Sequence, residues 1–372
     1  MSYSPARGWS LPCFPRLDSP RTLVLVFAGP AFRDAHGPLA ELGRAYPSSI
    51  VVGCSTAGEI HGTLVEDDSL SVAVVRFDRT ALRLVTTAVA KSAPSSEPGA
   101  VIGKALAGFG LRAVLVFSDG LAVNGTALLD GIHGVLPPDV VVTGGLAGDG
   151  SRFERTWVLV EGKPRADHVV GVGLYGEHLG VSHGSRGGWD AFGPERVVTR
   201  SEGNVLHELD GEPALALYKQ YLGDRAAGLP ATALLFPLAL RSGTVGQARV
   251  RTVLSVDETE QTMTFAGDIP HMSTVQLMRA NLDRLVDGAA LASQDAFADA
   301  SGDVFTLAVS CVGRRLVLGE RVEEEIEAVF ESMPAGSKLV GFYSYGEIAP
   351  FAPGQRAVLH NQTMTLTRLW ET

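Results

Sequence analysis

One short pattern occurs twice in this chain, and it restricts the possible folds more than any other feature. An apolar run that ends in a glycine-glutamate pair appears as VVGCSTAGEI at residues 51–60 and again as KLVGFYSYGEI at residues 338–348. In each copy the glycine permits a turn that a side chain would oppose. The glutamate then lies just beyond the end of a strand, where α/β proteins commonly bind ligands.

A longer pattern surrounds these pairs and occurs three times. Residues 23–89 read as an apolar strand, a helix, a second apolar strand, the glycine-acid turn and two further strands. Residues 101–175 repeat this order, with Gly148-Asp149 at the turn, and residues 304–369 close the chain in the same way. The sequence therefore predicts an α/β fold with mixed sheets built from repeated β-α-β-β-β units.

The segment between the second and third units has its own predicted elements. We expect a helix at residues 213–221, which begins with proline at a position where its missing N–H costs nothing. A buried strand is predicted at residues 231–240 and a hairpin with an acidic tip at residues 249–266. An apolar stripe at helical spacing predicts a long helix over residues 274–292.

The division of the chain follows from its length and its breaks. At 372 residues it is long for a single core, so we expect two domains, at residues 21–222 and 223–372, which meet where glycine and proline cluster in residues 223–230. Residues 1–20 contain four prolines and no apolar run typical of a secretion signal. We expect them to form a disordered tail.

Composition excludes several classes of partner. The formal net charge of −10 argues against nucleic acid and against anionic membrane surfaces, because phosphates favour an excess of lysine and arginine. No apolar run is long enough to span a bilayer. Three scattered cysteines are too few for a disulfide framework or a structural zinc site. These features predict a soluble, cytoplasmic protein.

The three turn acids, Glu59, Asp149 and Glu347, are the first candidates for ligand contact, because each follows the end of a strand. Beside Glu347, strand alternation sends the phenols of Tyr343 and Tyr345 to one face and the hydroxyl of Ser344 to the other. Aromatic rings with polar tips suit a pocket wall, but buried tyrosines often pack in a core with a backbone partner. We expect Glu347 to line the ligand pocket.

The polar stretch HNQT, at residues 360–363, supplies two more candidates. His360 and Asn361 lie among apolar residues, and buried polar groups are costly unless they are paired. His360 would contact a ligand or a haem iron, or would be a satisfied core histidine. Asn361 and Thr363 would contact the ligand or hold the Gly346 turn in place.

Cys54, Ser55 and Thr56 stand directly before the first turn. Cys54 and Ser55 are candidate nucleophiles, but the G-x-S-x-G elbow is absent and no base follows nearby in the sequence. A buried strand cysteine is commonly inert. We therefore keep all three residues as candidate ligand contacts. The G-x-G-x-x-G match at residues 171–176 is not followed by a helix pattern, so it does not predict a dinucleotide site.

These motifs resemble those of the FIST sensory proteins. The N-terminal FIST domain carries a segment like GCSTAGEI, and the C-terminal FIST domain ends in a GFYSYGEI segment followed by HNQT. ELDGEPA at residues 208–214 and Tyr218 are also similar to the family, and the resemblance spans nearly the whole chain from Leu23 to Trp370. One departure is His271-Met272, where the family pattern has an acidic residue and a glycine.

The resemblance implies a small-ligand sensor that passes its signal to a separate partner, such as a histidine kinase or a cyclase, because no output module is visible in the chain. Some family members look like haem-binding nitric oxide sensors, which makes haem a candidate cofactor with His360 as its ligand. Two alternatives stay open. One is an enzyme that acts on a small polar metabolite through Cys54, Ser55 and Glu59, and the other is an interaction scaffold.

Overall fold

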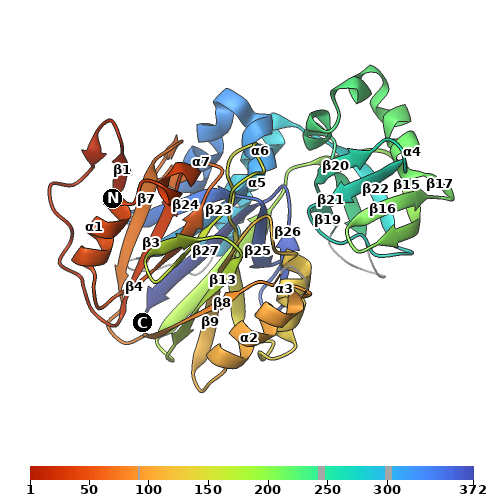
Figure 1. The fold of residues 1–372 in the computed structure, drawn as a ribbon. Helices are drawn as coiled ribbons and strands as arrows, with labels where there is room; N and C mark the ends of the chain where they lie inside the picture. The colour runs from red at the N-terminus through yellow and green to blue at the C-terminus, as the bar shows by residue number, and fades with distance from the viewer. Residues whose placement is uncertain (91–92, 242–247, 298–303) are drawn as a thin grey trace.

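Three related β-sheets form the larger body of the computed structural model, which describes residues 1–90, 93–241, 248–297 and 304–372 (Figure 1). In spatial order, the first sheet contains β12 (Lys163–Arg165), β11 (Val158–Val160), β4 (Ile50–Ser55), β3 (Thr22–Ala28), β7 (Leu70–Arg76), β1 (Ser2–Ser4) and β2 (Gly8–Trp9). The second contains β26 (Ala357–His360), β25 (Gly346–Pro350), β10 (Val141–Leu146), β9 (Leu111–Ser118), β13 (His168–Tyr175) and β8 (Ala81–Ala88). The third contains β14 (Leu179–Arg186), β27 (Met364–Glu371), β23 (Phe305–Cys311), β24 (Lys338–Ser344), β5 (Glu59–His61) and β6 (Leu64–Glu66).

Each sheet has the same centre, which confirms the predicted repeat of one module. Two parallel strands, β3 with β4, β9 with β10 and β23 with β24, lie beside one antiparallel strand. The hairpin that follows each glycine-acid turn does not stay in its own sheet. β5 pairs with β24, β11 pairs with β4, and β25 pairs with β10, so the three units exchange hairpins in a cycle.

The inner faces of the three sheets share one apolar core, and β3 shows how both of its faces are covered. Leu23, Leu25 and Phe27 point into the shared core, whereas Val24 and Val26 pack against α1 (Gly37–Ala45) and the N-terminal segment. All seven residues of β3 are buried, as expected for a strand with covered faces.

Helices cover the outer faces of the other two sheets (Figure 1). On the second sheet these are α2 (Ser96–Leu106) and α3 (Gly125–His133), and on the third they are α5 (Leu282–Phe297) and α7 (Val322–Glu331). A side-chain cap begins α3, because the Asn124 side chain accepts a hydrogen bond from the Ala127 N–H at 3.1 Å. α6 (Val312–Leu318) and η4 (Gly319–Arg321) connect β23 to α7, and η1 (Pro30–Arg33) follows β3.

Residues 190–279 form a separate small lobe, drawn in green and teal in Figure 1. Its sheet contains β19 (Arg249–Arg251), β18 (Leu238–Arg241), β22 (Thr274–Arg279), β15 (Asp190–Glu202), β16 (Val205–Leu209), β21 (Thr262–Phe265) and β20 (Val253–Asp257), with β17 (Glu212–Pro213) beside β16. Its helices are α4 (Ala214–Leu222), η2 (Gly223–Gly228) and η3 (Ala231–Leu235). The predicted helix at residues 213–221 and the acidic-tipped hairpin, now β20 and β21, are confirmed.

The lobe changes the expected division of the chain. The Gly/Pro cluster at residues 223–230 forms the 3₁₀ helix η2 and leads into η3 inside the lobe, whose own core includes Leu222 and Ala233. The chain instead crosses between body and lobe at residues 187–189 and 280–281. The hairpin exchange also places β5 and β6 in the third sheet, among strands of the C-terminal part. Residues 21–222 and 223–372 are therefore interleaved in space.

Three further expectations differ from the structure. Residues 274–292 are a strand, β22, followed by α5, because Val275 and Leu277 alternate toward the lobe core before the helix begins. Residues 231–240 are η3 followed by β18. Residues 1–20 are ordered in the structure: β1 pairs with β7, and the Trp9 indole N–H donates to Glu41 at 2.7 Å. Their aromatic side chains cover an apolar sheet face, which the prolines do not prevent.

Three phenylalanines lie where the inner faces of the sheets meet. Phe27 stacks on Phe342 with ring centroids 4.5 Å apart, and Phe117 lies 5.6 Å from Phe27 and 6.2 Å from Phe342. Phe27 comes from the first sheet, Phe117 from the second and Phe342 from the third, so the cluster joins all three sheets at one point.

We predict that Phe27→Ala lowers the free energy of unfolding by about 3 to 5 kcal/mol, the range for deleting a fully buried phenylalanine. Phe109→Ala is the matched control, because the Phe109 side chain is 99% exposed and its loss should change stability by less than about 0.5 kcal/mol. Urea unfolding of both variants measures the two values. Equal stabilities would contradict a central role for the aromatic cluster.

Candidate functional site

The three glycine-acid turns meet and hydrogen-bond to one another. The Ala57 N–H donates to the Tyr343 carbonyl, and the Tyr343 N–H donates to the Gly58 carbonyl, both at 2.8 Å. The second unit joins the first through a bond from the Gly148 N–H to the Ser55 carbonyl at 3.0 Å. The third joins the second through Tyr345, whose N–H donates to the Leu146 carbonyl at 3.2 Å. The predicted turn residues are thus brought together in one ring of backbone contacts.

Glu59 is buried and receives hydrogen bonds from its own turn and from the strand that follows. The Thr56 hydroxyl donates to one carboxylate oxygen. Ser69 donates to the other through both its N–H and its hydroxyl, each at 2.9 Å. Burial raises the pKa of Glu59 to about 8, and the bonds from Thr56 and Ser69 offset only part of that effect.

Glu347 repeats this arrangement in the third unit. The Ser344 hydroxyl donates to one carboxylate oxygen at 2.9 Å, and Thr363 donates to the other through its hydroxyl at 2.8 Å and its N–H at 3.2 Å. Burial raises the pKa of Glu347 to about 8 as well. The carboxyl group ties the turn to the HNQT stretch. Glu347 lies beneath the surface and lines none of the clefts found among the described residues.

Asp149 has a different set of partners. It accepts bonds from the N–H groups of Phe153 at 2.9 Å, Glu154 at 2.8 Å and Arg155 at 2.7 Å, and from the Tyr345 hydroxyl. Burial alone would raise the pKa of Asp149, but these donors hold it below its usual value. Asp149 therefore closes the loop before β11, and Tyr345, stacked on Phe153 at 4.5 Å, supports the same loop.

Tyr343 points to another part of the body. Its hydroxyl donates to Glu325 of α7 at 2.6 Å, whereas the Tyr345 hydroxyl contacts Asp149, so the two phenols do not line one pocket wall. Glu325 is fully buried and forms an ion pair with Arg314 of α6, which is also fully buried, at 2.7 Å. Arg314 donates in addition to the Gly187 carbonyl at 2.5 Å. This connects the third turn to the first crossing between body and lobe.

Cys54 and Ser55 lie in the interior. Cys54 belongs to the shared core, and burial raises the pKa of its thiol well above its usual value, which leaves the nucleophilic thiolate unpopulated. The Ser55 hydroxyl accepts a bond from the Trp157 N–H at 3.1 Å. Neither residue has a hydrogen-bonded base among the described residues, and the geometry gives no support to covalent catalysis by this pair.

A cleft of about 520 Å³ opens beside the first turn. Thr56 and Glu59 form part of its wall, together with Gly150 and Arg152 from the second unit and Arg315 from α6. Sequence reasoning missed Arg315 and Arg314, although two adjacent arginines in the short apolar segment VGRRLVL were a usable signal.

Arg315 is held in place at the rim of this cleft. Its guanidinium donates two bonds to Asp67, each at 2.7 Å, and a third to the Ala57 carbonyl. It also lies over the Tyr343 ring, 5.6 Å from the centroid. Gly58 has a φ of +139°, and a Cβ at this position would overlap the guanidinium. The turn glycine therefore provides the space that Arg315 occupies.

His360 and Asn361 lie elsewhere, next to the lobe. The His360 side chain is buried, its Nε2 is 2.9 Å from the Ala349 carbonyl oxygen, and its ring packs edge-on against Phe351 at 4.4 Å. Burial lowers the pKa of His360 to about 4, so the ring is neutral. Both polar atoms of the Asn361 amide are buried and have no hydrogen-bond partner among the described residues. The predicted site residues thus fall into two groups, one at the three turns and one in the HNQT stretch next to the lobe.

The surroundings of His360 do not fit a haem. Its Nε2 is engaged with a backbone carbonyl, and Phe351 covers the ring edge. The adjoining cleft has a volume of about 200 Å³, below the roughly 300 to 1,000 Å³ typical of ligand and cofactor pockets. No group of three or more potential metal ligands is found among the described residues.

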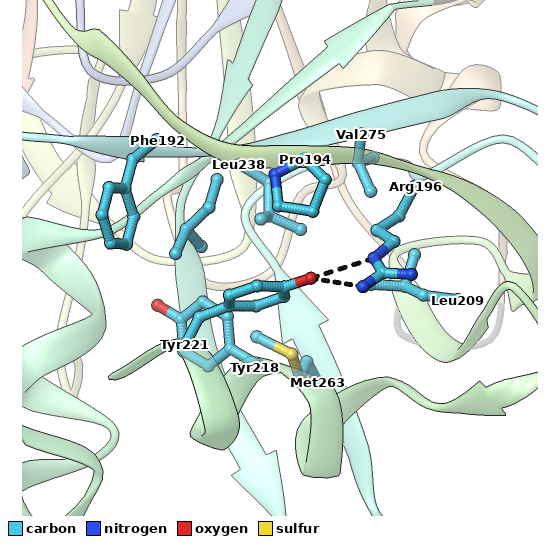
Figure 2. Close-up of a pocket in the computed structure, with 10 residues that line it drawn as sticks. Phe192, Pro194, Arg196, Leu209, Tyr218, Tyr221, Leu238, Met263 and Val275 are labelled. Atoms are coloured by element: carbon cyan, nitrogen blue, oxygen red, sulfur yellow. Dashed lines mark hydrogen bonds between the residues drawn. The ribbon is translucent and has the colours of Figure 1, made fainter. Parts of the chain in front are cut away.

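The lobe contains a smaller hollow, shown in Figure 2, next to the ELDGEPA stretch and Tyr218. The Tyr221 hydroxyl accepts bonds from the Arg196 guanidinium at 2.6 and 3.0 Å, and the Tyr218 hydroxyl donates to the Phe236 carbonyl at 2.7 Å. The volume of about 20 Å³ suits one water molecule at most. These residues serve the core of the lobe.

We predict that Glu347→Gln changes the pH dependence of stability. Because the folded-state pKa is near 8 and the unfolded value near 4.5, the folded chain holds an extra proton between these pH values. Its stabilising effect is complete below the lower value and is lost as pH rises through the higher one. The variant should therefore gain stability relative to the original protein from about pH 5 to about pH 8, by up to about 1.4 kcal/mol per pH unit.

Urea unfolding at several pH values measures this difference. If the variant loses a hydrogen bond, its free energy of unfolding changes by the same amount at every pH. The slope of the difference against pH is therefore the test. Glu177→Gln, which changes an exposed glutamate, is the control and should show a flat difference. A flat difference for Glu347→Gln would show that Glu347 is ionised in the folded protein.

Protein-family models match this chain, whereas none of the curated proteins does. Among the described helices, none is long and apolar enough to cross a membrane. The FIST N domain model matches residues 22–212, and the FIST C domain model matches residues 214–350. FIST domains are sensory rather than catalytic, and they are recognised as small-ligand domains of signal transduction. With both models matched along most of its length, the chain belongs to the FIST family.

Proposed function

We propose that this protein senses a small polar molecule in the cleft beside the first turn and passes the signal to a separate cytoplasmic partner, such as a histidine kinase or a cyclase. The supporting observation is the convergence of all three units on one cleft of about 520 Å³, a volume typical of small-molecule sites. Thr56 and Glu59 come from the first unit, Arg152 from the second and Arg315 from the third.

The charges in the cleft favour a ligand with both a positive and a negative group. Arg152 and Arg315 supply positive charge, whereas Asp67 and Asp68 supply negative charge, and Asp67 is already paired with Arg315. Glu59, with its pKa near 8, is mostly protonated at neutral pH and offers a hydrogen bond rather than a full charge. A zwitterion would place its carboxylate toward Arg152 and Arg315 and its ammonium group toward Asp68.

A connected set of contacts leads from this cleft to the lobe. Arg315 lies over the Tyr343 ring, the Tyr343 hydroxyl contacts Glu325, and Glu325 pairs with Arg314. Arg314 holds the Gly187 carbonyl at the chain crossing. A ligand that moves Arg315 would change this set of contacts and shift the position of the lobe, which gives a partner protein two states to distinguish.

The test uses the free amino acids alanine, lysine and glutamate as zwitterionic probes. Acetate and methylamine are the probes that carry a single charge. Thermal melting and calorimetric titration measure binding, because a ligand of the folded state raises the melting temperature. We predict that a zwitterion binds and that Arg315→Gln weakens its binding by about tenfold or more, the expected effect of losing a charged hydrogen bond. Arg200→Gln removes an exposed arginine paired with Glu208 in the lobe and should leave binding unchanged.

Failure of all three zwitterions to bind, together with the absence of any retained small molecule in native mass spectrometry of protein from its own host, would contradict the proposal. A Soret band in that protein would support haem sensing instead. Turnover that is abolished by Cys54→Ala would support an enzyme.

A further inference from the structure

A second cleft lies at the junction of body and lobe. The end of β14 and the crossing at residues 187–189 form its body side, with the turn after β25 and the end of β26. β19 and β22 form its lobe side. The volume is about 200 Å³, and the cleft shares no residue with the one that contains Glu59 and Arg315.

The polar groups of this cleft are suited to an anion. Ser185 is buried, lines the cleft, and its hydroxyl has no hydrogen-bond partner in the part of the chain that the structure describes. Arg186 and Arg249 also line it, and Arg186 shares its charge with Asp295 at 2.7 Å. No aspartate or glutamate is found among the described lining residues. A buried hydroxyl without a partner costs free energy, which a ligand oxygen would recover.

The remaining walls are apolar and partly aromatic. Trp189 and Phe351 face the cleft from the body, and Val250 and Met278 face it from the lobe. A protein cavity of about 150 Å³ accommodates benzene, so about 200 Å³ accommodates a benzene ring with one small polar substituent.

The HNQT turn joins this cleft to both parts of the molecule. The Trp189 indole N–H donates to the Gln362 carbonyl at 2.9 Å, and the Gln362 side chain donates to the Thr252 hydroxyl of the lobe at 3.0 Å. Arg251 of β19 reaches the Leu359 carbonyl of the body at 3.2 Å. The amide of Asn361, in the same turn, is also buried without a hydrogen-bond partner among the described residues.

We propose that this hinge cleft binds a small carboxylate with an apolar body, about the size of benzoate, and that the bound molecule holds the lobe against the body. The carboxylate accepts hydrogen bonds from Ser185 and from the Arg249 guanidinium. The ring lies between Trp189 and Phe351 on one side and the lobe residues on the other. The bound molecule contacts both sides of the hinge, so its binding favours the closed arrangement.

Benzoate is the probe, and benzamide, which has nearly the same shape but no charge, is its matched comparison. Titration of the full chain is followed by calorimetry and by tryptophan fluorescence, since Trp189 is in the wall. We predict saturable binding of benzoate that is at least roughly tenfold tighter than that of benzamide. The fluorescence response should disappear in Trp189→Phe.

Two variants test the assigned contacts independently, in case one of them alters the fold. Ser185→Ala and Arg249→Gln should each weaken benzoate binding by roughly tenfold. Ser182→Ala changes the same strand on its other face, where the hydroxyl donates to Ala296, and Arg112→Gln removes an exposed positive charge from the body. Both control variants should bind benzoate like the original protein.

Hydrogen exchange tests the hinge. Benzoate should slow amide exchange in residues 249–251 and 360–363, which meet across the junction. Equal affinity for benzoate and benzamide, or equal weakening in the control variants, would overturn the carboxylate site. Tight binding without slower exchange in these two segments would overturn its role in lobe closure.

Discussion

The buried pair of Arg314 and Glu325 holds together parts of the molecule that are distant in the sequence. Both side chains are excluded from solvent, and such a pair is stable only when hydrogen bonds satisfy the groups around it. The hydroxyls of Tyr343 and Ser310 also donate hydrogen bonds to the Glu325 carboxylate. The carbonyls of Gly187 and Leu285 accept hydrogen bonds from the Arg314 guanidinium. One ionic contact therefore fixes α6, α7 and β24, together with the crossing into the lobe. Removing either partner leaves an uncompensated charge in the interior.

The three turns use the same geometry for different purposes. Glu59 and Glu347 each take one hydroxyl from the residue three positions earlier and two donors from a later serine or threonine. Of the three turn acids, Glu59 alone lines a cleft found among the described residues, because the space around its turn is lined by α6 and by the loop of the second unit. Glu347 is covered by the HNQT turn. The repeated motif is thus a structural device, and its surroundings determine which copy reaches a cleft.

The sequence predicts the repeated units because their strands are covered on both faces and appear as continuous apolar runs. It also identifies the turn acids as candidate site residues, since carboxylates beside buried strands need hydrogen-bond partners. It does not show the exchange of hairpins, because the local pattern of β5 is the same whichever strand it joins. The lobe was missed because residues 187–189 resemble any short loop. The helix expected at residues 274–292 was partly wrong. The reason is that an alternating strand is followed almost directly by an apolar stripe at helical spacing.

The exchange of hairpins has a consequence for the way the protein is made. β5 emerges early in synthesis, but its partner β24 lies almost three hundred residues later, as the pairing of Glu59 with Phe342 shows. The sheet of the third unit cannot assemble around β5 until the last part of the chain has left the ribosome. Folding is then dominated by contacts of long sequence separation, which form slowly and leave strand edges exposed in the meantime. A nascent chain of this kind keeps those edges unpaired for most of its synthesis.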